Sequence, residues 1–254
     1  MFTKKRKASA TPRSPAAPRG RGRPRGPTEQ GAQARQDLYK TAIQLIVARG
    51  YEATTLRDIA KRAGVSVGLL YRYFPSKRAV VLALYDELSA EYAARGAKMG
   101  PGPWRERFVF ALEASLGVLG RQRRTLAALL PVLVGDAHEG LFAPATAFSR
   151  QRVLAVFQEA VAGASDAPGL EDGAALGRVL YLVHLAIILW WLLDKSPDQR
   201  ATRELVSMLE RVLPIAALAL RTGPARGWLR TADRLFRDGL IGDGTAPSRA
   251  AGEP

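Results

Sequence analysis

The segment from Thr54 to Lys77 carries most of the side chains whose types and spacing could do chemistry. Hydroxyl groups and cations recur through it, at Thr55, Ser66, Tyr71, Arg72, Tyr73 and Lys77. Such groups donate hydrogen bonds to phosphate oxygens and to the edges of bases. The chemistry that the segment predicts is therefore recognition of nucleic acid.

Short helices separated by tight turns are expected to position these side chains. Apolar residues at helical spacing, among them Leu38 and Leu45, predict a first helix over about 29–49 that Gly50 ends. Thr54-Thr55 can cap a second helix, LRDIAKRA, which Gly64 closes.

A turn at Val65-Ser66 leads into a third short helix, VGLLYRYF, and Pro75-Ser76-Lys77 opens a fourth. A helix, a tight turn and a second short helix make up the helix-turn-helix, whose second helix enters the major groove of DNA. The spacing thus predicts a DNA-binding head.

The run TTLRDIA, followed by AGVSVGLLYRYFPSK, resembles the DNA-binding domain of the TetR/AcrR family of transcriptional regulators over residues 35 to 85. The resemblance implies that Thr55, Tyr71, Tyr73 and Lys77 contact the DNA backbone. It places the following residues in or beside the recognition helix: Ser66, Val67, Gly68, Leu69 and Arg72. Many members carry a polar residue at Val67 and Thr at Leu69, so direct hydrogen-bond readout is expected to be sparse and to centre on Arg72.

Residues 1–27 contain nine Lys or Arg residues and no acid, and they hold most of the formal net charge of +15. Their Pro, Gly, Ser and Arg content predicts a disordered arm. Within it, PRGRGRP resembles an AT-hook, which would place Arg21 and Arg23 in a minor groove. The alternative is a basic tail that binds phosphates without reading sequence.

The rest of the chain is nearly neutral and predicts only helices, so the expected fold is all-α with about nine or ten helices. Expected helices are 104–120, 122–135, 142–163, 171–195, 198–221 and 227–241. We expect a disordered arm (1–27), a three-helix head (28–80), a larger helical domain (81–241) and a disordered tail (242–254). In the family that the motif resembles, two long helices pair in a homodimer, here 171–195 and 198–221. A monomer with a thick core is the alternative.

The same resemblance implies a small effector, which we expect to be apolar or aromatic with one polar handle. The candidate pocket residues are Trp104, Phe108, Phe142, Phe148, Tyr181, His184 and Trp190. For each aromatic residue, packing in the core is the competing interpretation. The resemblance thus implies a repressor that binds a palindromic DNA operator and is released from it when the effector binds.

Several classes of protein are excluded or disfavoured. The chain has no Cys and only two separated His residues, His138 and His184, so neither thiol catalysis nor a clustered metal site is expected. We expect no enzyme and no cofactor. Residues 1–27 lack the apolar core of a signal peptide, and the apolar stretch 179–193 is short for a membrane span, which favours a cytoplasmic protein. Two alternatives remain open: a nonspecific architectural DNA-binding protein that relies on the arm, and a protein of anionic membrane surfaces.

Overall fold

A computed structural model describes residues 29–135, 138 and 140–242, which form helices and connecting turns with no strand among them. The α-helices are α1 (Glu29–Arg49), α2 (Leu56–Ala63), α3 (Val67–Tyr73), α4 (Lys77–Gly96), α5 (Trp104–Gly120), α6 (Arg123–Ala128), α7 (Leu130–Gly135), α8 (Ala147–Ala162), α9 (Leu170–Leu193), α10 (Arg200–Ala219) and α11 (Gly223–Phe236). Two 3-10 turns, Pro144–Thr146 and Pro197–Gln199, and a π-helical turn, Arg237–Ile241, complete the described elements. The all-α class is confirmed.

The expected helix bounds differ from the observed ones in a few places. The single helix expected over 122–135 is divided at Leu129 into α6 and α7. The helix expected over 142–163 begins with a 3-10 turn and becomes α-helical only at Ala147. Helix α11 begins four residues earlier than expected because Pro224, in its first turn, is already set in a helical conformation. The basic arm, with Arg21 and Arg23, and residues 243–254 lie outside the described residues.

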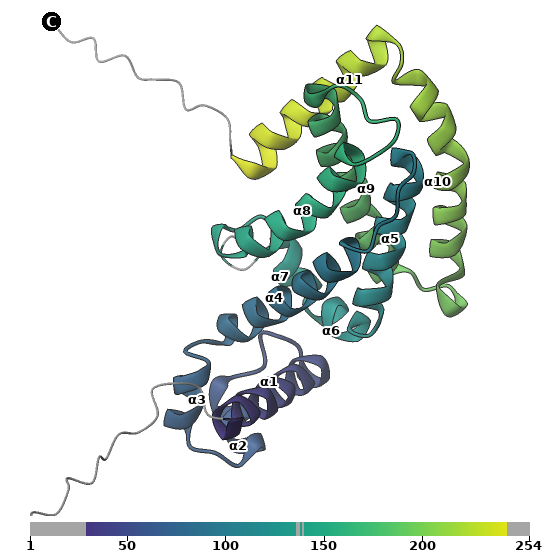
Figure 1. Ribbon diagram of the computed structural model, residues 1–254. Helices are drawn as coiled ribbons and strands as arrows, with labels where there is room; N and C mark the ends of the chain where they lie inside the picture. The colour runs from purple at the N-terminus through teal and green to yellow at the C-terminus, as the bar shows by residue number, and fades with distance from the viewer. Residues whose placement is uncertain (1–28, 136–137, 139, 243–254) are drawn as a thin grey trace, which may run out of the picture.

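Helices α1 to α3 form a small unit at one end of the molecule, and α4 leads from it into the larger part (Figure 1). Buried side chains of α1 and α2, including Ile46 and Ile59, pack with Leu70 of α3. Val80 and Val81, in the first turns of α4, are fully buried with them. The expected boundary between residues 80 and 81 therefore lies within α4, a helix that both parts share.

The larger part is built around α4, α5, α8 and α9, which pack against one another. Helix α10 leans on α5 and α9, and α11 lies across α9 (Figure 1). Aromatic rings fill the centre: Phe157 of α8 lies 5.9 Å from Phe108 and 6.1 Å from Tyr181 between ring centroids. These helices form the frame in which any site of the larger part must lie.

Helix α9 is the one described helix that is long and apolar enough to cross a membrane, with a mean hydropathy of 1.9 over its most apolar window. It lies close to the expected helix 171–195, and it is longer than the apolar stretch 179–193 because Leu170 and the residues after it are also helical. By length and composition alone, one such helix is weak evidence for a span. Its first turns carry Asp172 and Arg178, which form ion pairs with α11. These pairs indicate a core helix of the folded domain.

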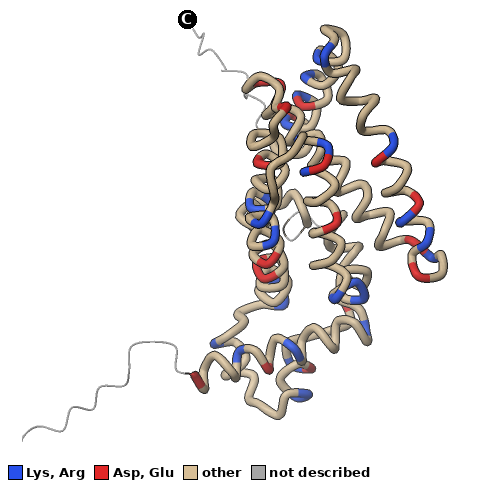
Figure 2. The backbone as a smooth tube through the Cα atoms, turned by 45° about the vertical axis from the view of Figure 1, so that its right-hand side comes forward, with Lys and Arg blue, Asp and Glu red and all other residues tan. Residues whose placement is uncertain are grey.

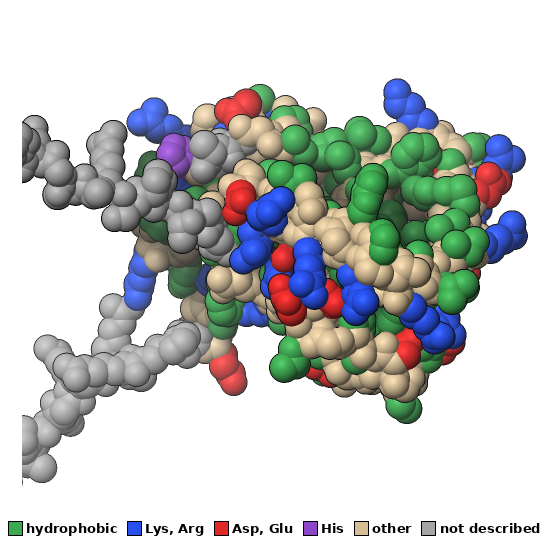
Figure 3. Space-filling view, turned by 90° about the horizontal axis from the view of Figure 1, so that it is seen from above, with side chains coloured by type: hydrophobic (Ala, Val, Ile, Leu, Met, Phe, Trp, Pro, Cys, Tyr) green, Lys and Arg blue, Asp and Glu red, His purple; other side chains and the backbone are tan. Residues whose placement is uncertain are grey.

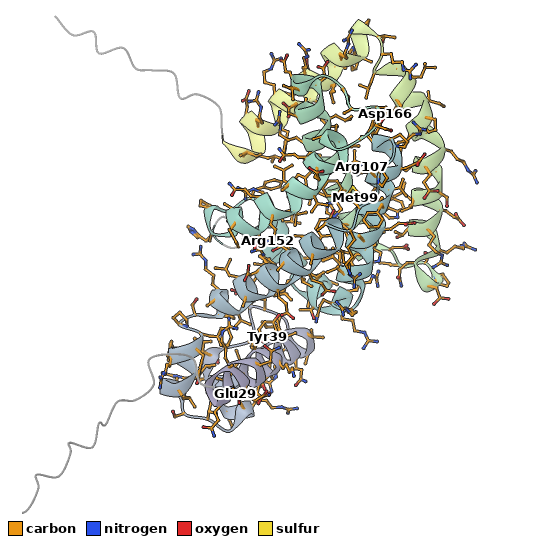
Figure 4. The ribbon with its side chains drawn as sticks, in the orientation of Figure 1. Glu29, Tyr39, Met99, Arg107, Arg152 and Asp166 are labelled. Carbon is orange, nitrogen blue, oxygen red and sulfur yellow. The ribbon has the colours of Figure 1, made fainter. Side chains whose placement is uncertain are left out.

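A buried arginine joins the start of α5 to the end of α8. Arg107 is 7% exposed, and its guanidinium donates to the carbonyl oxygens of Gly100 at 2.6 Å, Glu159 at 2.8 Å and Ala160 at 3.0 Å. Figure 4 labels Arg107 close to Met99 and Asp166, which belong to the loops before α5 and after α8. One side chain thus satisfies carbonyls from two separate segments.

We expect Arg107→Ala to lower the free energy of unfolding by about 2–4 kcal/mol, because three carbonyls lose a charged donor and a buried side chain is removed. Urea unfolding followed by circular dichroism measures this change. The control is Arg200→Ala, which removes an exposed ion pair with Glu204 and should change stability by less than about 0.5 kcal/mol. Equal effects of the two substitutions would contradict the role given to Arg107.

Candidate DNA-binding head and ligand cavity

A reciprocal cap fixes the start of α2. The Thr55 hydroxyl accepts from the Asp58 backbone N–H at 3.1 Å and donates to the Asp58 carboxylate at 2.6 Å, while the Thr55 N–H donates to the same carboxylate at 3.1 Å. These hydrogen bonds favour the charged carboxylate and hold the pKa of Asp58 below its usual range. The one proton of the Thr55 hydroxyl is thus already used. The backbone N–H of Thr55 is used in the same way. A phosphate at this point can therefore accept from the N–H groups of the first turn of α2, and from Thr55 only if this cap is broken.

The turn between α2 and α3 is as the sequence predicts. Gly64 adopts the left-handed conformation, with φ 67° and ψ 28°, and its N–H donates back to α2 carbonyls. Ser66 then caps α3 by accepting from the Leu69 N–H at 3.2 Å. The turn therefore sets the direction in which α3 leaves α2.

Helix α3 buries one edge and exposes the other. Leu70 is fully buried, Val67 and Tyr73 are half-buried, and the remaining candidates are exposed: Ser66, Gly68, Leu69, Tyr71 and Arg72. Tyr71 has 51% of its surface exposed. The exposed edge presents a hydroxyl, a phenol and a guanidinium, which are groups that can donate to DNA.

Lys77 has an internal role that the sequence did not suggest. Its ammonium group donates to the Tyr51 carbonyl at 2.6 Å and lies 3.9 Å from the centroid of the Tyr51 ring. This contact joins the start of α4 to the loop after α1. The side chain remains 22% exposed, so its charge is only partly available to a partner.

Further exposed cations lie on α2, namely Arg57, Lys61 and Arg62. Figure 2 shows Lys and Arg positions spread over the head. These three residues were not among the predicted DNA contacts. Their exposure could have been predicted from the sequence. Ile59 and Ala60 form the buried face of α2, and the three cations lie outside that face.

The larger part encloses a cavity of about 490 Å³, within the range of about 300–1,000 Å³ usual for small-molecule sites. Residues from α4, α5, α8 and α9, from α6 and α7, and from the π-helical turn line it. Leucine is the commonest lining residue, as in Leu88, Leu119, Leu126 and Leu185. The cavity therefore suits a mostly apolar ligand.

Three of the seven predicted pocket residues, Phe142, Tyr181 and His184, line this cavity. His184 is 3% exposed, its Nε2 lies 2.8 Å from the Ser115 hydroxyl, and burial lowers its pKa to about 3. Burial also raises the pKa of the Tyr181 phenol.

The other four predicted pocket residues do not line this cavity. Trp104 and Phe108 are buried in the core. Core packing was the alternative that the sequence left open for these aromatic residues. Phe148 is exposed and packs under the Arg152 guanidinium at 4.3 Å, and Trp190 is half exposed. Three further lining residues, Tyr85, Ser89 and Tyr92, lie on the apolar face of α4 and were not predicted.

Arg150 is the only charged residue among the described residues that line the cavity. Its Nη1 donates to the carbonyls of Leu141 at 3.1 Å and Ala143 at 3.3 Å. The Thr146 hydroxyl donates within the same segment, and it lies 2.9–3.0 Å from three of its carbonyls. Both side chains thus fold the segment before α8 against the cavity.

The C-terminal helix completes the wall. Arg230 pairs with Asp172 at 2.6 Å and Arg178 pairs with Asp233, so two ion pairs hold α11 on α9. The hydrogen bond from Arg230 lowers the pKa of Asp172. Phe236 then packs on Tyr181 and Phe142, with ring centroids 6.2 and 6.3 Å away, and Leu240 lines the cavity.

Groups of three or more His, Cys, Asp or Glu residues that could hold a metal ion are absent from the part of the chain described here. The described residues provide an exposed edge of α3 with hydrogen-bond donors and a mostly apolar cavity, and α4 passes between them.

Known proteins match both parts of this arrangement. Residues 38–84 match the family model for bacterial regulatory proteins of the tetR family. The HTH-type transcriptional repressor KstR of Mycobacterium tuberculosis is 32% identical over 192 residues, which cover 70% of this chain and 81% of that protein. KstR of Mycolicibacterium smegmatis is 28% identical over 188 residues, covering 70% of this chain and 88% of that protein.

Solved structures agree in fold. A TetR transcriptional regulator from Nitrosomonas europaea superposes with a TM-score of 0.53 at 21% identity, covering 71% of this chain and 97% of that one. The TetR family regulator PfmR from Thermus thermophilus gives a TM-score of 0.52 at 20% identity, covering 70% and 95%. The chain thus belongs to the TetR family of bacterial regulatory proteins, which are sequence-specific DNA-binding transcriptional regulators and not enzymes.

Proposed function

We propose that this chain is a transcriptional repressor that binds a palindromic operator as a homodimer and is released by a small apolar ligand. The observation that carries the proposal is the position of α4, which begins in the core of the DNA-binding head and ends in the wall of the cavity. The names of the KstR relatives support repression as the sign of regulation. As a regulator of its family, the protein acts on DNA in the cytoplasm.

The recognition helix is α3. Arg72 is the side chain suited to bidentate donation to guanine, and Leu69 can contact only apolar groups such as a thymine methyl. The DNA backbone is contacted by Tyr71, Tyr73 and Lys77. The backbone N–H groups at the start of α2, next to its N-cap Thr55, contact it as well. The exposed α2 cations add contacts with phosphates.

The homodimer pairs α9 and α10 with their mates. Helix α10 exposes an apolar face of Met208, Val212, Ile215 and Leu218, and α9 exposes Leu189, Trp190 and Leu193. Apolar side chains gather on the right of Figure 3, the side on which α10 stands in Figure 1. A face of this size on a soluble protein is typical of an interface, and two-fold pairing would place two α3 helices on half-sites about 34 Å apart or a multiple of that spacing.

Substitution of the recognition helix tests the DNA-binding proposal. We expect Arg72→Ala to weaken binding of the selected operator by about 1–3 kcal/mol and to relax sequence preference, because a base-edge donor is lost. Fluorescence anisotropy on operator and scrambled duplexes measures both. The control is Arg234→Ala, which removes an exposed charge from α11 and should leave the affinity unchanged. Unchanged preference in Arg72→Ala would argue against α3 as the reading helix.

Deletion of residues 1–27 separates the arm from the head. We expect the truncated protein to keep its preference for the operator over random DNA but to show a shallower dependence of log K on log salt, since fewer phosphates are neutralised. Titrations at two salt concentrations measure the slope. If the deletion abolished all affinity while Tyr71→Ala had no effect, the nonspecific architectural alternative would be correct.

A charge on the α10 face tests the dimer. We expect Ile215→Glu to give a monomer at micromolar concentration and to weaken operator binding. Ile215 is 68% exposed in one subunit, and dimerisation would bury the carboxylate of the substituted glutamate at the interface. Light scattering measures the mass. Leu170→Glu is the matched control at a residue 97% exposed at the start of α9, and it should stay dimeric. A wild-type chain that is monomeric both alone and on DNA would refute the dimer.

A further inference from the structure

Two polar atoms beside the cavity have no hydrogen-bond partner among the described residues. They are the hydroxyl oxygen of Tyr92, on α4, and Nδ1 of His184, on α9. Both side chains are 3% exposed, and both line the cavity. Buried polar groups in folded proteins are nearly always paired, and leaving them unpaired is unfavourable. The unpaired atoms therefore point to a partner that the chain itself does not provide.

The surroundings of these two groups fix what they can bind. The Tyr92 and His184 rings lie almost parallel, 3° apart in plane with centroids 6.2 Å apart, and Phe157 packs 4.8 Å from the His184 ring centroid. Ser115 lies 2.8 Å from the other nitrogen, Nε2. Because the serine hydroxyl can donate to Nε2 or accept from it, Nδ1 can act as an acceptor or as a donor. A phenol also does both, so the pair can bind either a hydroxyl or a carbonyl oxygen.

The charge state of the region favours an uncharged partner. Burial lowers the pKa of His184 to about 3 and raises that of Tyr92, so both groups are neutral at neutral pH. An ion placed between them would have no counter-charge. The one cation of the described lining, Arg150, already donates to the carbonyls of Leu141 and Ala143.

We propose that the cavity selects ligands with an apolar body and one uncharged oxygen, a hydroxyl or a carbonyl, which hydrogen-bonds to Tyr92 and His184. This inference rests on the proposed function, because it names the class of ligand that would release the repressor. The oxygen joins α4, which carries the DNA-binding head, to α9, which belongs to the body. A hydrocarbon of the same size fills the cavity but lacks this link.

The test uses four probes of one chain length: 1-decanol, 2-decanone, 1-fluorodecane and decanoate. Calorimetry and thermal shift on the full chain, without DNA, give the affinity for each. We expect Tyr92→Phe to weaken binding of the alcohol and the ketone about tenfold and to leave 1-fluorodecane unchanged, because only an oxygen partner loses a hydrogen bond. His184→Phe removes the second hydrogen-bond partner. It should also weaken binding of the alcohol and the ketone and leave binding of 1-fluorodecane unchanged.

The ligand-free variant gives a second readout. We expect Tyr92→Phe to unfold at the same temperature as the wild type or higher, since it deletes an unpaired buried hydroxyl. A purely structural tyrosine would instead lower the melting temperature and weaken all probes alike. Tyr39→Phe is the control, because it deletes a buried tyrosine hydroxyl in the head, remote from the cavity lining, and should leave every probe affinity unchanged.

Three results would overturn the proposal: no stabilisation by either oxygen-bearing neutral probe, equal losses for all probes in Tyr92→Phe, or tightest binding of decanoate with a dependence on Arg150→Gln. Operator binding by the wild-type chain is measured separately. Its absence would refute the proposed function, while the probe affinities would still decide the ligand class.

Discussion

Helix α4 is packed at both of its ends, and the rest of the structure depends on this constraint. Val80, Val81 and Leu84 are buried with the helices of the head, whereas Tyr85, Leu88 and Tyr92 line the cavity. Lys77 fastens the first residue of the helix to the Tyr51 carbonyl. In the proposed function, a ligand that shifts the cavity end of α4 would move the head as well, because the same helix is packed in both parts.

The other helices around the cavity, α5, α8, α9 and α11, are held together by arginine contacts as well as by apolar packing. Arg107 joins α5 to α8, Arg150 folds the segment before α8, and Arg178 and Arg230 hold α11 on α9. Guanidinium groups suit this role because several N–H donors in a fixed plane can satisfy carbonyls and carboxylates together. Two lining helices reach the head: α4, whose first turns are buried in it, and α6, which packs on α1 and contributes Leu126 to the cavity.

The head could be predicted almost completely from the sequence because its information is local. Thr55, Gly64 and Ser66 are caps or turn residues within a few positions of the hydrogen bonds that they form. The cavity could be predicted only in part. Whether an aromatic residue on an apolar helix face meets the core, a cavity or solvent depends on which helices pack against that face, so Trp104, Phe148 and Tyr181 could not be told apart. For the same reason, neither the position of Tyr92 in the cavity wall nor the contact of Lys77 with Tyr51 could be predicted from neighbouring residues in the sequence.

Coupling between the cavity and the DNA is the central claim, and thermodynamic reciprocity tests it most directly. The measurement is the affinity of the chain for 1-decanol in the absence and in the presence of saturating operator duplex. If α4 links the two sites, operator should weaken 1-decanol binding by the same factor by which 1-decanol weakens operator binding. An affinity for 1-decanol that is the same with and without operator would contradict the account.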